Sequence, residues 1–126
     1  MLETAIVLPL LLLMVLGIVE LGRVMMLNQV STNATREGCR RAIIPGASDS
    51  GIVDICNQYL DVANVAQTGR QVKILNAAGE EAKLSTISSH EPVTVQIQLP
   101  YDENTWGFSS IAPGRTLTTE ITMRRE

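Results

Sequence analysis

The residues best suited to a chemical role are the acids that bracket an apolar run. Residues 4–19 carry no charge, Glu3 precedes them and Glu20 follows them. Burying a carboxylate in hydrocarbon is costly unless it finds a partner. For Glu3 two readings follow: an acid favoured at a helix N-terminus by the helix dipole, or an acid paired with a positive group on a neighbouring copy.

Glu20 and Arg23 stand three residues apart, a spacing that lets them pair on one face of a helix. On an isolated helix this is a minor surface pair. Within a bundle of helices it would fix the stagger between subunits.

The two cysteines, Cys39 and Cys56, are separated by sixteen residues. In an exported protein this spacing predicts a disulfide that closes a corner between two helices, worth about 3 kcal/mol. The alternative is two free buried thiols. No CxxC motif is present and the single histidine, His90, is remote, so the pattern indicates no metal site.

Other signs of catalysis or cofactor binding are weak. His90 has no serine or cysteine nucleophile in a recognisable motif, and residues 102–104 lack the spaced ligands of a calcium loop. The formal charge is −3 and the basic residues are mostly scattered, which argues against a nucleic-acid-binding face. We therefore expect a protein that is not an enzyme and needs no cofactor.

The apolar run opens a helix predicted to cover residues 2–44 and to stop at Pro45-Gly46. Its apolar half, residues 4–27, would rise about 36 Å, enough to cross the hydrocarbon core of a bilayer. Pro9, Gly17 and Gly22 interrupt this half, and we expect either a mild kink or local unwinding when the helix packs into an assembly.

The rear half of the helix is two-faced. Small and apolar residues recur there at spacings of three and four, and we expect the sheet or a second helix to dock on them. This stripe consists of Leu27, Val30, Ala34, Gly38 and Ala42. On the opposite face Glu37 can reach Arg41.

The rest of the chain, residues 45–126, predicts one small head domain. A second helix is expected over about 51–66, and alternating strands over 70–76, 91–99 and 115–125, with a short extra strand over 82–87. The fold class is therefore α+β, with an antiparallel sheet of three to four strands packed on the long N-terminal helix.

A loop over residues 100–114 holds most of the aromatic side chains. These are Tyr101, Trp106 and Phe108. They form either a hydrophobic cluster tucked onto the head's own sheet or a contact patch for neighbouring subunits.

Three stretches carry a resemblance: Glu3-Thr-Ala-Ile-Val-Leu-Pro9, then Gly17-Ile-Val-Glu20-Leu-Gly22-Arg23, then Asn33-Ala-Thr-Arg36-Glu37-Gly38. Together they resemble the TadE-like family, pseudopilin-type proteins of tight-adherence pili and relatives of type IV pilins. The resemblance implies removal of a leader by prepilin peptidase, a wait in the bacterial inner membrane, and extraction by the pilus assembly machinery.

The resemblance also implies the function. The extracted subunit would join a homo-oligomeric helical filament at the cell surface, with the N-terminal helices as its core and Glu3 helping to register the incoming subunit. The alternative is a minor pseudopilin, or a single-pass tethered accessory protein, that never polymerises. The family usually carries a short basic leader and an acid two residues further along, so we expect either an unusual processing site or a longer precursor.

Overall fold

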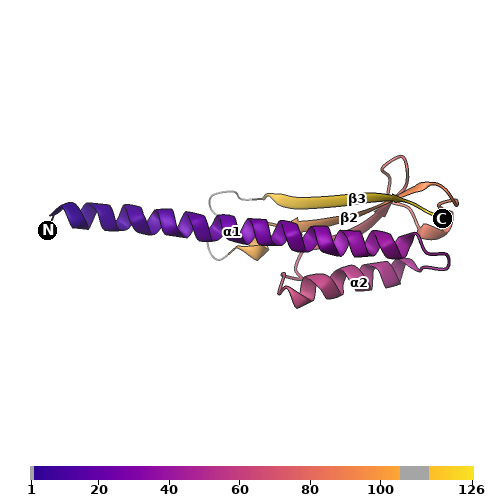
Figure 1. The fold of residues 1–126 in the computed structure, drawn as a ribbon, viewed down its shortest axis with the longest axis horizontal. Coiled ribbons are helices and arrows are strands. Elements are labelled where there is room, and N and C mark those ends of the chain that lie inside the picture. The colour runs from indigo at the N-terminus through magenta and orange to yellow at the C-terminus, as the bar shows by residue number, and fades with distance from the viewer. Residues whose placement is uncertain (1, 106–113) are drawn as a thin grey trace.

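The computed structural model describes residues 2–105 and 114–126, except the side chains of residues 2 and 3. Helix α1 (Leu2–Ala42) runs the length of the molecule, and a head packs on its rear half (Figure 1). The head contains helix α2 (Asp49–Val62) and strands β1 (Gln71–Leu75), β2 (Pro92–Pro100) and β3 (Thr116–Arg124). The predicted α+β fold with a long N-terminal helix is confirmed.

Helix α1 is continuous for 41 residues and passes through Pro9, Gly17 and Gly22 without a break. It ends two residues before the predicted boundary, and Gly46 then takes a left-handed φ of 85° that turns the chain back. Near this end Glu37 pairs with Arg40 at 3.9 Å. The pair forms at a spacing of three residues, not with Arg41 as the sequence predicted.

The sheet is antiparallel, with β2 in the middle of the order β1-β2-β3. The alternation predicted for β2 is confirmed, because every second side chain is at most 1% exposed. These side chains are Val93, Val95, Ile97 and Leu99. They face helices α1 and α2, which form the second layer of the head (Figure 1).

The extra strand predicted over residues 82–87 is wrong. That segment instead holds a 3₁₀ helix, Leu84–Thr86, so the sheet has three strands among the described residues. Leu84 and Ile87 are both buried. A 3₁₀ turn places residues three apart on the same side, so it delivers both side chains to the core without a ladder partner.

Helix α2 starts and ends earlier than the sequence predicted. The Ser48 hydroxyl accepts a hydrogen bond from the Gly51 N–H at 3.2 Å and caps the first turn. At the other end Asn64 takes a left-handed φ of 54°, a conformation that asparagine tolerates better than most residues. Val65 then turns into the core and its N–H donates to the Leu60 carbonyl.

The small-residue stripe of α1 is where the head docks, as predicted. Leu27, Ala34 and Ala42 are at most 1% exposed. A Cβ added to Gly38 would lie 2.6 Å from the Cys56 sulfur, closer than real Cβ atoms come to other heavy atoms. Gly38 therefore lets helix α2 approach α1 at this point.

Cys39 and Cys56 are buried free thiols, so the predicted disulfide is not confirmed and the alternative describes this structure. The Cys39 thiol donates to the Ile121 carbonyl of β3 at 2.8 Å, and the Cys56 thiol donates to the Ala34 carbonyl of α1 at 3.5 Å. Neighbouring residues on a helix point about 100° apart. Cys56 faces Gly38, so the next residue, Cys39, is turned toward the sheet.

These thiols predict a loss of stability in alkali. Burial raises the pKa of Cys39 from 9.0 to about 11. Burial, and then the charge of Cys39, raise that of Cys56 from 9.0 to about 12. The unfolded state therefore loses its thiol protons first, and stability present below pH 9 declines as the pH rises toward these values. The shift at Cys39 alone corresponds to about 3 kcal/mol.

Urea unfolding at about pH 8 and about pH 10.5 measures this loss. The variant with both Cys39→Ala and Cys56→Ala is the control, and its stability should fall much less between the two pH values. An equal fall in the two proteins would contradict the role of the thiols.

Candidate functional site

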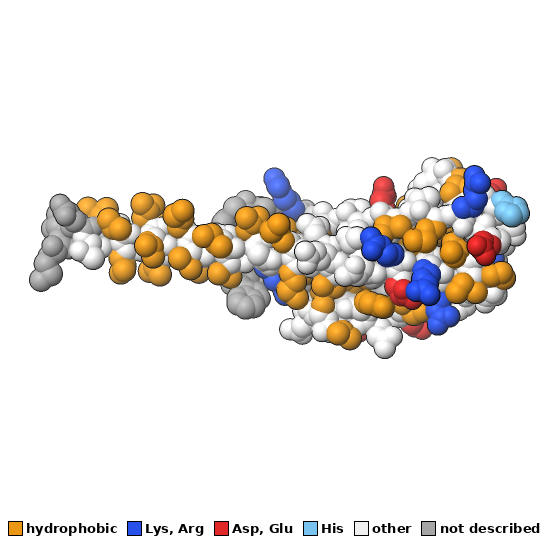
Figure 2. All heavy atoms as spheres, viewed as in Figure 1, with side chains coloured by type: hydrophobic (Ala, Val, Ile, Leu, Met, Phe, Trp, Pro, Cys, Tyr) orange, Lys and Arg blue, Asp and Glu red, His pale blue; other side chains and the backbone are white. Residues whose placement is uncertain are grey.

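The front of helix α1 is covered by no other described part of the chain. Its apolar side chains are exposed on every side, with Leu10 68% and Met14 70% exposed. Figure 2 shows them as a bare apolar rod that projects from the head. By length and composition this helix can cross a membrane, and the apolar window is not buried by the head.

The predicted assembly residues of this rod lie on α1 as follows. Glu3 belongs to the helix, and its side chain is outside the described atoms. Pro9 lies inside the helix. A Cβ added to Gly17 or Gly22 would meet no described atom within 4 Å, so the described part of the head leaves the surface at both glycines open to a neighbouring molecule.

Glu20 and Arg23 both bind the head, which replaces the pair predicted between them. The Tyr101 hydroxyl donates to a Glu20 carboxylate oxygen at 2.6 Å. The Arg23 Nε–H donates to the Asn104 carbonyl at 3.1 Å. One turn of α1 is therefore held against the segment that follows β2, and we call these two contacts the helix–head junction.

The Glu20 carboxylate also raises the pKa of Tyr101, chiefly through their hydrogen bond. The bond needs the phenol proton, so its contribution to the junction is lost as the pH rises through the raised pKa of Tyr101. Of the predicted aromatic contact loop, Tyr101 thus binds the chain's own long helix. Trp106 and Phe108 lie outside the described residues.

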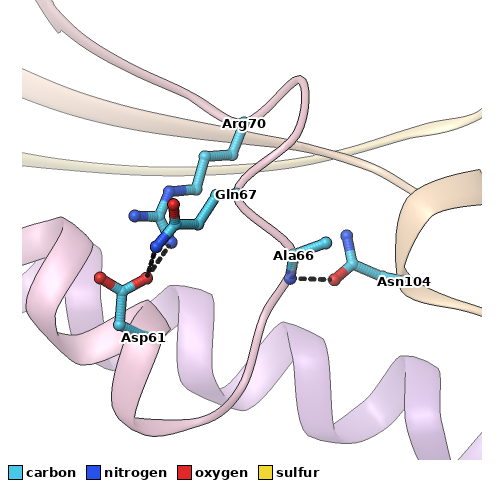
Figure 3. A network of polar contacts seen from close by, with 5 residues as sticks. All are labelled: Asp61, Ala66, Gln67, Arg70 and Asn104. Carbon is cyan, nitrogen blue, oxygen red and sulfur yellow. Dashed lines mark hydrogen bonds and ion pairs between the residues drawn. The ribbon is translucent and has the colours of Figure 1, made fainter.

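Asn104 holds the junction together, and sequence reasoning missed this role. The residue is 3% exposed, and both polar atoms of its side chain are hydrogen-bonded. Its Oδ1 accepts from the Ala66 N–H at 2.9 Å (Figure 3), and its Nδ2 donates to the Pro100 carbonyl at 2.9 Å. The Asn104 carbonyl also accepts from Arg23, so Asn104 links α1, the α2–β1 connection and the end of β2.

A second polar group fixes the connection that Asn104 binds. The Asp61 carboxylate accepts from the Arg70 guanidinium at 2.7 Å and from the Gln67 amide at 3.3 Å (Figure 3). The Arg70 hydrogen bond lowers the pKa of Asp61. Because Asp61 is exposed, the group contributes mainly by positioning the loop near Ala66.

An open cleft of about 560 Å³ lies beside the junction. Its lining combines one arginine with two acids and several amide groups, including Arg23, Asp61, Gln67, Glu103 and Asn104. Among the described residues, no three histidine, cysteine or acidic side chains are arranged to hold a metal ion. Asp102 instead accepts a hydrogen bond from the Gly114 N–H at 2.9 Å.

The apolar rod and the charged turn behind it lie within the N-terminal third of the chain, and this third carries a family match. Residues 1–40 match the family model for TadE-like proteins. The TadE-like match confirms the resemblance drawn from the sequence, and it covers Glu3, Pro9, Glu20 and Arg23. No curated protein and no solved structure matches the chain.

The TadE-like segment and the exposed apolar helix together indicate a pilus-related, membrane-anchored protein. The TadE-like family is structural rather than enzymatic. The match ends at residue 40, near the last turn of α1, so the head carries no family assignment of its own.

Proposed function

We propose that this protein is a structural pilin or pseudopilin subunit that polymerises through the front of helix α1 into a surface filament. One observation carries the proposal: a long, wholly apolar helical rod that the chain's own head leaves uncovered. Such a surface must lie in lipid or against other helices. The same rod serves both environments, first the inner membrane and then the filament core.

The junction suits a subunit that is moved as a unit. Because Tyr101 and Asn104 tie the head to Glu20 and Arg23, a pull on the head is transmitted directly to the helix. The open surfaces at Gly17 and Gly22 would let a neighbouring helix approach closely, since small residues permit close helix packing in membranes. Prepilin peptidase and the assembly machinery would act as partners, as the resemblance implies.

Electron microscopy of material sheared from the producing cells, with mass spectrometry of its content, tests this proposal. We expect thin filaments built mainly of this chain. Filaments made of something else, with this chain confined to the membrane fraction, would contradict polymerisation. The terminal peptides would also locate the mature N-terminus.

The variant Glu3→Ala should assemble about tenfold less well or worse, because an incoming subunit would lose its charged partner in the apolar core. Filament yield in the sheared fraction measures the effect. Glu80→Ala, which removes an exposed acid from the head, is the matched control and should assemble normally. Normal filament yield from Glu3→Ala would contradict the registration role.

A tethered accessory protein that never polymerises is the second candidate. The open cleft of about 560 Å³ at the base of the head favours it, because a binding module needs an accessible recess. In that case the rod would serve only as an anchor, and purified membranes would retain the chain after filaments are sheared away.

A further inference from the structure

We propose that the base of the head, Tyr101–Thr105 together with Glu20 and Arg23, is a surface that docks onto phospholipid headgroups while helix α1 spans the membrane. The proposal rests on the membrane-spanning stage of the proposed function and adds the partner of the junction. It follows from the length of the rod, the polar contacts at its end and the charges of the cleft.

The free part of the rod is too short to span a bilayer alone. Among the described residues the head first contacts α1 at Glu20, so the described part of the head leaves residues 4–19 free for lipid, and these rise about 24 Å. A hydrocarbon core is about 30 Å thick and needs about 20 helical residues. The last turn required extends to about residue 23, which is the turn that carries the junction.

This turn of α1 has an apolar side and a polar side, as a turn at the edge of the hydrocarbon core requires. Leu21 and Met25, on the side away from the head, are 61% and 60% exposed and apolar. Glu20 and Arg23, on the near side, are half-buried against the head. Lipid chains can therefore reach the far side of the helix while the head occupies the near side at the same depth.

The junction also gives the acid at this depth a partner. A carboxylate at the edge of the hydrocarbon is costly without a hydrogen bond, and the Tyr101 hydroxyl supplies one at 2.6 Å. Tyrosine is itself a residue that favours the boundary between hydrocarbon and headgroups, because its ring is apolar and its hydroxyl polar. The hydrogen bond thus offsets part of the cost of placing the Glu20 charge at the interface.

The charges of the adjoining cleft identify the kind of headgroup. Arg23 can meet a phosphate, and the exposed Glu103 can meet an ammonium group, whereas Asp61 is already paired with Arg70. A surface with both signs fits a zwitterionic headgroup that carries both groups, such as phosphatidylethanolamine, better than a purely anionic one. The expected occupant is therefore the headgroup layer of a zwitterionic bilayer.

The full chain in phosphatidylethanolamine-containing vesicles tests the proposal by depth-dependent fluorescence quenching. A fluorophore is attached to Val62→Cys at the end of α2 beside the cleft, or to Glu80→Cys in the β1–β2 connection, both of which are exposed sites outside the docking surface. The native thiols are fully buried with raised pKa values, so they do not compete for the label in the folded protein. Flotation of the chain with the vesicles confirms that the chain is bound to the membrane.

We expect a headgroup nitroxide to quench the label at residue 62 several-fold more than the label at residue 80. Tyr101→Phe should reduce this difference, whereas Tyr59→Phe, which changes an exposed tyrosine on α2, should not. If the chain floats with the vesicles and the two sites are quenched equally, the docking surface is overturned and the proposed function stands. Chain that fails to float would overturn the membrane span itself.

An unchanged difference in Tyr101→Phe would overturn the role given to the Glu20–Tyr101 pair. Repeating the measurement with phosphatidylglycerol alone tests the headgroup assignment. Stronger quenching on the purely anionic vesicles would overturn the preference for a zwitterionic layer.

Discussion

Replacing Gly38 with valine is expected to lower the free energy of unfolding by about 3 kcal/mol. A Cβ at this position would lie 2.6 Å from the Cys56 sulfur and 3.4 Å from a Val95 methyl carbon, and both of these groups are buried. Neither neighbour can move into solvent, so helix α2 must shift away from α1. Urea unfolding in detergent micelles, followed by circular dichroism, measures the loss.

Two controls separate this clash from a general intolerance of substitution. Gly22→Ala adds a Cβ where none of residues 2–105 and 114–126 comes within 4 Å, so stability should be unchanged or slightly higher. Gly38→Ala should destabilise the native protein and become neutral or stabilising when Cys56→Ala removes the sulfur. Equal costs of Gly38→Ala in both backgrounds would show that Cys56 does not set the limit.

Replacing Asn104 with alanine is expected to cost about 3 kcal/mol of stability. The Ala66 N–H and the Pro100 carbonyl would both lose their hydrogen-bond partner at a site that is 3% exposed. Each unsatisfied buried group costs about 1–3 kcal/mol. Urea unfolding reports the loss of stability. The rate of amide hydrogen exchange at Ala66 should rise, because the Ala66 N–H loses its acceptor.

Asn33→Ala, on the exposed surface of α1, is the matched control and should leave both measurements unchanged. Asn104→Asp keeps the acceptor for Ala66 but places a carboxylate oxygen beside the Pro100 carbonyl. Its Ala66 amide should stay protected while stability falls. Native stability in Asn104→Ala would contradict the linking role of this side chain.

The elements with a strong hydrophobic period could be predicted from the sequence. In β2, four apolar residues alternate with polar ones, and the structure buries all four. The stripe of α1 that carries Gly38 was likewise identified as the docking face. These predictions succeed because burial of one face decides both the element and its orientation.

The junction could not be predicted, because its bonds join residues about 80 positions apart. Glu20 and Arg23 have the spacing of a local pair. Only the fold brings Tyr101 to Glu20 and Asn104 to Arg23. The disulfide failed for a related reason. Periodicity correctly placed Cys39 and Cys56 on buried faces. However, Cys56 faces Gly38, and Cys39, one residue further along α1, points about 100° away toward β3.

The separation of these contacts in sequence also bears on how fast the head folds. Helix α1 meets β3 through Cys39 and Ile121, which are 82 positions apart, and β2 pairs with β3 across the connection that contains the junction. Such non-local contacts close large loops before they gain packing, so a mixed head of helices and strands folds more slowly than a helical bundle, which takes microseconds to milliseconds. The docking stripe of α1 would remain bare until the head folds, so a newly inserted chain has a window in which its helix is anchored and its head is still open to wrong partners.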